Sequence, residues 1–114
     1  MAHDKELADR IRRSLAHRSS VREVSMFGGL SFMVNGKLTV GAHNDGDLML
    51  RCDPERVDDL LGERGAAWAE MNGRRMGKGW MVVTAEGIAH QEDFNFWIGV
   101  ALEFNEELTG KDGR

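Results

Sequence analysis

Cysteine, proline and tyrosine are scarce or absent in this chain of 114 residues, which has one cysteine, one proline and no tyrosine. A single cysteine excludes an intrachain disulfide and any thiolate-rich zinc or iron–sulfur site. That residue, Cys52, precedes an Asp-Pro helix start, where a thiol can become reactive. Because no histidine or second cysteine lies close to it in the sequence, we expect Cys52 to be a small buried side chain instead.

Long apolar runs are also absent. No segment has the length and hydrophobicity needed to span a membrane, and the first six residues lack the apolar core of a secretory signal. We therefore expect a cytoplasmic protein that has no membrane partner.

Residues in catalytic spacing are missing as well. The four histidines are scattered, with no His-x-x-x-His or His-Glu-x-x-His pair, so no preorganised metal or acid–base site is visible. The serines lack the Gly-x-Ser-x-Gly elbow of a hydrolase. The chain has no tyrosine, so that common general acid is absent as well. We therefore expect a protein that is not an enzyme and that uses neither a cofactor nor a metal ion.

The charge balance disfavours direct DNA binding. The formal net charge is −4, whereas nucleic-acid affinity comes mainly from Lys and Arg side chains that neutralise phosphates. No helix-turn-helix or zinc-finger pattern is present. The three arginines of the run 10–13 fall on the polar side of a predicted N-terminal helix, whose apolar side is formed by Leu7, Ala8, Ile11 and Leu15.

The middle of the chain predicts an antiparallel β-meander. Alternating apolar residues follow the segment Met26-Phe27-Gly28-Gly29, and a glycine pair suits a strand that closely approaches another backbone. Asn35-Gly36 is typical of a type I′ hairpin turn. Two more strands are expected at 38–42 and 48–51, on either side of the polar turn 44–47.

Three helices are expected to cover this meander. In addition to the N-terminal helix, Asp53-Pro54 starts a short middle helix, and a long C-terminal helix starts near Gln91. The apolar run 80–84 predicts an interior strand. The length allows one domain, residues 1–114, with flexible ends near 1–4 and 109–114. The expected fold is α+β, with two layers: an antiparallel meander sheet packed with an N-terminal, a short middle and a long C-terminal helix.

Two glycine-rich signatures, Met26-Phe27-Gly28-Gly29 and then Met76-Gly77-Lys78-Gly79-Trp80, resemble in this order the N-terminal domain of the TfoX/Sxy family of bacterial competence regulators. The residues that match the family's motifs are Met26, Phe27, Gly28, Gly29, Gly36, Gly79 and Trp80. The resemblance runs from about Leu7 to Leu108 and implies a two-layer architecture similar to that of secretion chaperones. Full-length regulators carry a second, C-terminal helical domain, so we expect this chain to be a stand-alone N-terminal-like domain.

The resemblance also implies a function. Competence regulators of this family look like coactivators that work with an activator of the cyclic-AMP receptor type, and family members often pair. We therefore expect a non-catalytic interaction module in transcriptional regulation, whose partner is a protein of the transcription machinery or a second copy of the chain.

The C-terminal helix is apolar over most of its circumference, which suggests a surface for that partner. Phe96, Val100 and Phe104 widen its apolar stripe beyond what one face of a small sheet can cover. These three side chains either pack against the N-terminal helix or form a surface for a dimer or another partner. The sequence leaves both alternatives open.

A cationic loop supplies the alternative function. Arg74, Arg75 and Lys78 stand among glycines just before Trp80, and glycine-rich backbone with nearby cations often binds phosphate. However, Gly77-Lys78 is not followed by Ser or Thr, and the segment leads into a strand where a phosphate loop would lead into a helix. A small-ligand or phosphate-binding module that uses this loop is therefore the second candidate.

Overall fold

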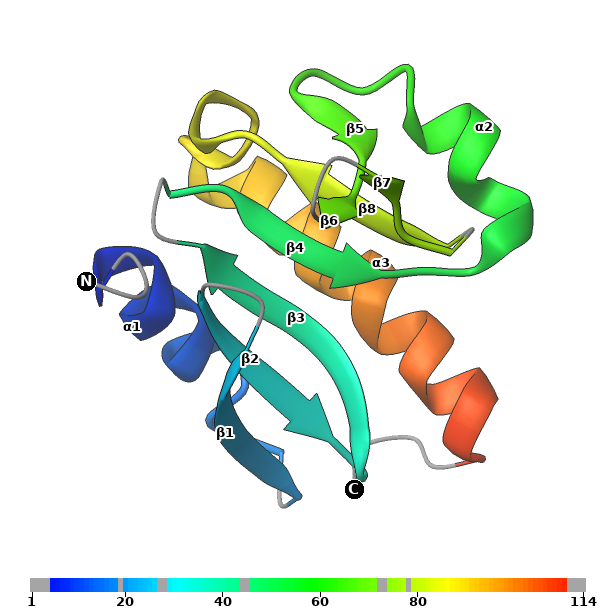
Figure 1. Ribbon diagram of the computed structural model, residues 1–114. Coiled ribbons are helices and arrows are strands. Elements are labelled where there is room, and N and C mark those ends of the chain that lie inside the picture. Colours follow the sequence, from blue (N-terminus) through cyan, green and yellow to red (C-terminus); the bar gives the residue numbers. More distant parts are fainter. Residues whose placement is uncertain are drawn as a thin grey trace.

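The fold is a six-stranded antiparallel sheet with two helices on one face (Figure 1). The structure is a computed structural model, and it describes residues 5–18, 20–26, 29–43, 46–71, 74–77 and 79–110. In chain order its elements are α1 (Lys5–Ser14), β1 (Val21–Met26), β2 (Gly29–Val34), β3 (Lys37–His43), β4 (Leu48–Arg51), the 3-10 turn η1 (Pro54–Arg56), α2 (Val57–Leu60), β5 (Ala66–Trp68), β6 (Glu70–Met71), β7 (Arg74–Arg75), β8 (Trp80–Val83), the 3-10 turn η2 (Ala85–Ile88) and α3 (Gln91–Thr109). The strand order is β1-β2-β3-β4-β8-β5, and β6 and β7 form a separate hairpin.

A hydrophobic core lies between the sheet and the two helices α1 and α3. One row of directly paired residues crosses four strands, from Phe32 through Val40 and Leu50 to Met81, and none of these side chains is more than 1% exposed. Because side chains alternate between the two faces of a strand, this row and its neighbours make one apolar face. Helix α3 covers it with buried aromatic side chains such as Trp97. The expected two-layer α+β fold, with its three helices, is confirmed.

The sheet begins earlier than the sequence suggested. We expected the meander to be headed by Met26–Gly29, but β1 starts at Val21 and pairs with β2 from Val21↔Val34 to Met26↔Gly29. The Met-Phe-Gly-Gly signature therefore joins two antiparallel strands and does not open a single one. Phe27 and Gly28 themselves lie outside the described residues, as does the side chain of Met26.

The close backbone approach expected of the glycine pair is present at Gly29. A Cβ atom at this position would lie far inside van der Waals contact with the carbonyl oxygen of Ala42 on β3. Only a residue without a side chain allows β2 and β3 to approach in this way. The next turn also follows its prediction: Asn35 and Gly36 both have positive φ, 54° and 79°, as a type I′ turn requires.

The second half of the sheet contains elements that the sequence analysis did not resolve. Strand β8 lies between β4 and β5, so the interior strand expected at 80–84 is confirmed. The sequence predicts one further strand or hairpin through Trp80; the structure has β8 there and adds β5 and the separate β6–β7 hairpin. Thr109 and Gly110, at the start of the expected flexible end, close α3, with Gly110 in the left-handed conformation. The residues beyond them, and 1–4, lie outside the described residues.

Cys52 is fully buried, as expected. Burial is the main cause that raises the pKa of its thiol to about 11, which keeps it protonated at neutral pH. A protonated, buried thiol is a poor nucleophile. No helix among the described residues combines the length and the hydrophobicity that crossing a membrane requires.

Candidate interaction surface

The apolar stripe of α3 that suggested an interaction surface is divided into two parts. Val100 is 2% exposed and belongs to the hydrophobic core, so its assignment to the surface is corrected. Phe96 is 43% exposed, and Phe104 is half-buried. Arg56 of η1 forms an ion pair with Glu103, with 3.6 Å between Nη1 and Oε2. This contact places η1 beside the part of α3 that carries Phe104. Phe96 and Phe104 therefore face different surroundings.

Phe104 lies next to Arg51 and Trp80, two residues from distant parts of the chain. The guanidinium carbon of Arg51 is 5.2 Å from the centre of the Trp80 ring system and 5.5 Å from the centre of the Phe104 ring. Both distances are within the range of cation–π attraction. The Arg51 side chain thus holds together two residues that the sequence analysis had assigned to separate features.

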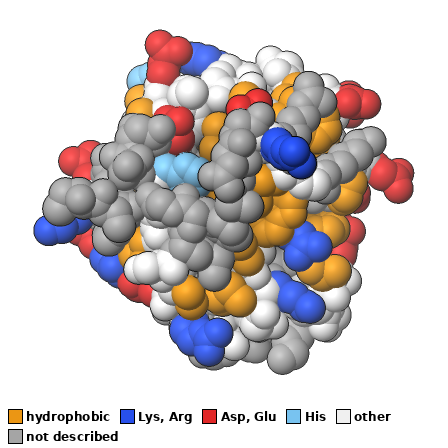
Figure 2. Space-filling model, viewed as in Figure 1, with side chains coloured by type: hydrophobic (Ala, Val, Ile, Leu, Met, Phe, Trp, Pro, Cys, Tyr) orange, Lys and Arg blue, Asp and Glu red, His pale blue; other side chains and the backbone are white. Residues whose placement is uncertain are grey.

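Two further apolar side chains, Leu38 and Leu108, line the same shallow depression as Arg51 and Phe104. Leu38 is half-buried, and Leu108 is 41% exposed, one of the two large hydrophobic residues, with Phe96, that are exposed in the described part of the chain. We call the combined surface the Arg51 patch: Leu38, Arg51, Trp80, Phe104 and Leu108. In Figure 2, hydrophobic side chains adjoin Lys and Arg side chains over the region where β4, β8 and α3 meet.

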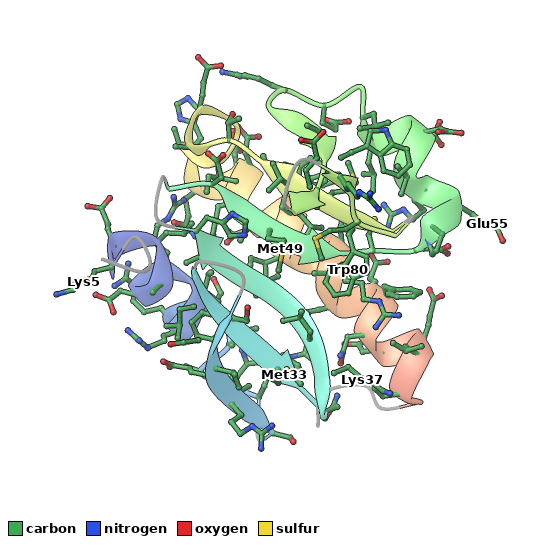
Figure 3. All side chains as sticks on the ribbon, in the orientation of Figure 1. Lys5, Met33, Lys37, Met49, Glu55 and Trp80 are labelled. Carbon is green, nitrogen blue, oxygen red and sulfur yellow. The ribbon has the colours of Figure 1, made fainter. Side chains whose placement is uncertain are left out.

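The ends of two strands position the patch. Arg51 is the last residue of β4 and pairs directly with Trp80, the first residue of β8. Figure 3 shows Trp80 on the side of the sheet that is turned to the viewer, in front of α3. Because α3 continues past these strand ends (Figure 1), its later turns can reach Arg51.

Gly79 fixes the register of these strand ends. It has a positive φ of 102°, and a Cβ atom there would lie 2.9 Å from the carbonyl oxygen of Cys52 and 3.3 Å from Cγ of Pro54. The backbone N–H of Cys52 donates a hydrogen bond of 2.7 Å to the carbonyl oxygen of Gly79. The glycine before Trp80 therefore allows the chain after β4 to pack against the start of β8, and this contact sets Arg51 opposite Trp80.

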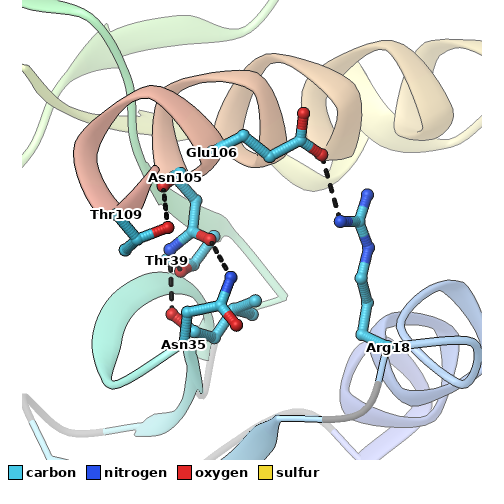
Figure 4. A network of polar contacts seen from close by, with 7 residues as sticks. Arg18, Asn35, Thr39, Asn105, Glu106 and Thr109 are labelled. Atoms are coloured by element: carbon cyan, nitrogen blue, oxygen red, sulfur yellow. Dashed lines mark hydrogen bonds and ion pairs between the residues drawn. The ribbon is translucent and has the colours of Figure 1, made fainter. Parts of the chain in front are cut away.

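A buried polar network fixes α3 beneath the patch (Figure 4). Asn105, which is 3% exposed, donates hydrogen bonds to the carbonyl oxygen of Val34 at 2.9 Å and to Oγ1 of Thr39 at 3.1 Å. It accepts a third from the side chain of Asn35 at 3.1 Å. The last turns of α3 are thus attached to the β2–β3 hairpin on the side of the helix next to Leu38 and Leu108.

The cationic loop does not form a visible anion site among the described residues. Of the three cations of this loop, the structure describes only the side chain of Arg74, on β7. Arg74 is exposed. Lys78 and the side chain of Arg75 lie outside the described residues, so the loop stays a prediction. Trp80, the aromatic member of that candidate site, belongs to the Arg51 patch.

The basic run on α1 serves the fold. Arg10 stacks over the ring of Phe94 at 4.2 Å and donates a hydrogen bond to the carbonyl oxygen of Ile88. Arg12 is paired with Glu23 of β1 and with Asp9. Two of the arginines in this run are therefore occupied by contacts within the chain.

No group of three or more potential metal ligands occurs in the part of the chain that the structure describes.

Arg51 is the residue of this surface that sequence reasoning missed. It follows the apolar segment 48–50 and looks like a solvated strand end. Its partners are 29 and 53 positions away, beyond the reach of local patterns. The available signal was weak: a Trp at the start of one strand and an Arg at the end of an earlier one can be cross-strand neighbours in an antiparallel sheet.

One comparison with known proteins identifies a family. The sequence matches the model of a protein family described as the TfoX N-terminal domain, over residues 13–105. No curated protein and no solved structure gives a match.

Proposed function

The chain belongs to the TfoX N-terminal domain family, and from that premise we propose that it is a non-catalytic module that acts through protein–protein contacts in transcriptional regulation. The observation that carries the proposal is the Arg51 patch. It offers a partner two aromatic rings, an arginine and two leucines in one place.

The composition of the patch supports protein recognition. Trp and Arg are enriched among the residues that dominate binding energy at protein interfaces, and such residues cluster where surrounding contacts exclude water. The rings of Trp80 and Phe104 are half-buried, so part of each remains available to a partner. Arg51, held between them, keeps donors that can meet a carboxylate or a carbonyl oxygen of that partner.

The patch is also preorganised. The glycine contact at Gly79 and the hydrogen bonds of Asn105 hold the strand ends and α3 in place without a partner. A surface that is already ordered loses less conformational entropy on binding than a flexible one. This is what an interaction module requires, whereas the described residues give no comparable support to the phosphate-binding alternative.

Affinity capture with surface variants tests the proposal. The tagged protein is used as bait in a lysate of its own organism, beside Leu108→Asp and Phe104→Asp. Ala67→Asp, at an exposed position of β5, is the matched control for an added surface charge. We expect a transcription activator or an RNA polymerase subunit to be enriched, and to be lost with both patch variants but retained with the control.

The folded state of each variant is checked by circular dichroism. Leu108 is 41% exposed and lies outside the hydrophobic core, so its replacement leaves the core intact even if Phe104→Asp destabilises the protein. Recovery of the same partner with all four baits, or recovery of the bait alone, would contradict the proposal.

A further inference from the structure

A second surface, at the other end of the same apolar stripe, surrounds the exposed Phe96. Its ring stands at the edge of a depression of about 380 Å³ that is lined by Glu63, Arg64, Gly87, Glu92, Asp93, Phe96 and Trp97. The depression lies between the turn after α2, the turn η2 and the first turns of α3. It shares no residue with the Arg51 patch.

The walls of the depression are fixed by two glycines. A Cβ atom at Gly87 would lie 2.5 Å from the carbonyl oxygen of Arg64, and one at Gly65, whose φ is +80°, would lie 2.6 Å from Oγ1 of Thr84. The N–H of Thr84 donates a hydrogen bond of 3.0 Å to the carbonyl oxygen of Gly65. These contacts hold the turn that carries Glu63 beside η2 and the start of α3.

Three acidic residues line the depression, and in the described part of the chain none of them forms an ion pair. Glu92 and Asp93 stand in the first turn of α3, where they also favour the helix dipole. Glu63 comes from a different element and has no such role. Against the single cation Arg64, the depression carries a net charge of about −2, because the three acids outnumber it.

Trp97 packs behind Phe96. The two ring centroids are 5.2 Å apart at an interplanar angle of 77°, and Trp97 is 2% exposed. This contact supports the Phe96 ring while leaving it 43% exposed. An aromatic ring that is exposed beside unpaired carboxylates is suited to a cation, which the ring attracts through its face and the acids attract through their charge.

We propose that the Phe96 depression binds an arginine side chain from a basic segment of a protein partner. Arginine fits better than lysine because its planar guanidinium stacks on an aromatic ring and at the same time donates paired hydrogen bonds to carboxylates. The inference does not rest on the Arg51 patch, and a partner could use either surface alone.

The test is a titration of the folded chain with two short peptides, acetyl-Gly-Arg-Gly-Arg-Gly-amide and its lysine counterpart, followed by two-dimensional amide NMR. We expect saturable shifts at Gly87, Phe96 and the indole of Trp97 with the arginine peptide, weaker ones with the lysine peptide, and a loss of both as salt is raised. Equal binding of the two peptides would overturn the assignment to arginine.

Three variants locate the site. Phe96→Leu, which keeps an apolar side chain but removes the ring, is expected to weaken binding about threefold, and Glu92→Gln by a similar factor. Glu107→Gln, which removes one exposed charge from the same helix outside the depression, is the matched control and should leave the affinity unchanged. An equal effect of Glu92→Gln and Glu107→Gln, or shifts spread over all acidic residues, would show non-specific attraction and overturn the proposal.

Arg64 provides a test in the opposite direction. It is the one cation in the lining of the depression, and its charge repels an incoming guanidinium, so Arg64→Gln should strengthen binding of the arginine peptide. Unchanged or weaker binding in this variant would contradict the proposed electrostatics. These measurements use the isolated chain, so their failure leaves the capture experiment on the Arg51 patch unaffected.

Discussion

Replacement of Asn105 by alanine should destabilise the protein more than any other single polar-to-alanine change on α3. The side chain is 3% exposed, donates two hydrogen bonds and accepts a third. Asn105→Ala removes all three and leaves the carbonyl oxygen of Val34 without its side-chain donor. The lost contacts join the last turns of α3 to the β2–β3 hairpin, so the loss is tertiary and is not confined to the helix.

The magnitude follows from the number of bonds. A buried hydrogen bond contributes about 1 kcal/mol net, and alanine recovers about 0.5 kcal/mol of helix propensity. We therefore expect the free energy of unfolding to fall by about 2.5 kcal/mol. For a domain of this length, about 4 °C is lost per kcal/mol, so Tm should fall by about 10 °C.

Thermal unfolding followed by circular dichroism measures this change. Asn95→Ala is the matched control, because Asn95 is an exposed asparagine on the same helix whose side chain accepts a hydrogen bond from Gln91, four residues earlier. Its Tm should stay within about 2 °C of the parent. Equal Tm values for the two variants would refute the assignment of stability to the buried network.

A double-mutant cycle isolates one bond of the network. Thr39→Val removes the hydroxyl that accepts from Asn105 and donates to the carbonyl oxygen of Lys37. If the bond at 3.1 Å matters, the two substitutions together should cost about 1 kcal/mol less than the sum of the single ones. Strict additivity would show that the two side chains act independently.

Three further predictions concern the strand junction, the buried thiol and self-association. Gly29→Val should lower the free energy of unfolding by about 3 kcal/mol because the valine side chain has no room against Ala42. Gly99→Ala, at a position where nothing lies within 4 Å, should raise it by up to about 1 kcal/mol. Equal melting temperatures for the two variants would contradict the close approach at Gly29. Burial raises the pKa of the Cys52 thiol to about 11, whereas its pKa in the unfolded chain is about 8.5. The stabilising contribution of the neutral thiol should therefore be fully present below pH ~8.5 and be lost as the pH rises from there to about 11. Without tyrosine the other side chains that titrate in that range are lysines, so Cys52→Ala should flatten the profile, and an unchanged slope would count against the shift. If a second copy of the chain is the partner, light scattering during gel filtration should give a dimer mass that Leu108→Asp halves; a monomer at high concentration would exclude this.

Local patterns predicted the parts of the fold that are locally determined. The type I′ turn at Asn35-Gly36 and the glycine contact at Gly29 depend on backbone conformations that few residues tolerate, so the residue types alone indicate them. The long apolar helix from Gln91 was visible for the same reason. Strand β1 was missed because its apolar residues, Val21, Val24 and Met26, are mixed with polar ones. An edge strand buries little surface, so its hydrophobic pattern is weak.

The candidate site could be predicted only in part, because its residues meet through tertiary packing. Phe104 was identified from the width of the apolar stripe, but the stripe could not show that Val100, one turn earlier, is buried. That depends on non-local packing, because Val100 belongs to the same core cluster as Val57 and Leu60 of α2. Phe96 lines the depression beside η2, whereas Phe104 lies next to Arg51, so the one expected surface is two.

The family signature near Trp80 gains a physical role from this arrangement. A side chain at position 79 would collide with Cys52 and Pro54, so this position requires glycine. The contact brings the end of β4 beside the start of β8, and the cross-strand pair that results is Arg51 with Trp80. Gly79, which the sequence placed in a candidate phosphate loop, thus allows the close backbone approach that brings the residues of the Arg51 patch together. Gly79→Ala should therefore disturb both stability and partner capture, whereas Leu108→Asp should disturb capture alone, and this difference separates the construction of the surface from its use.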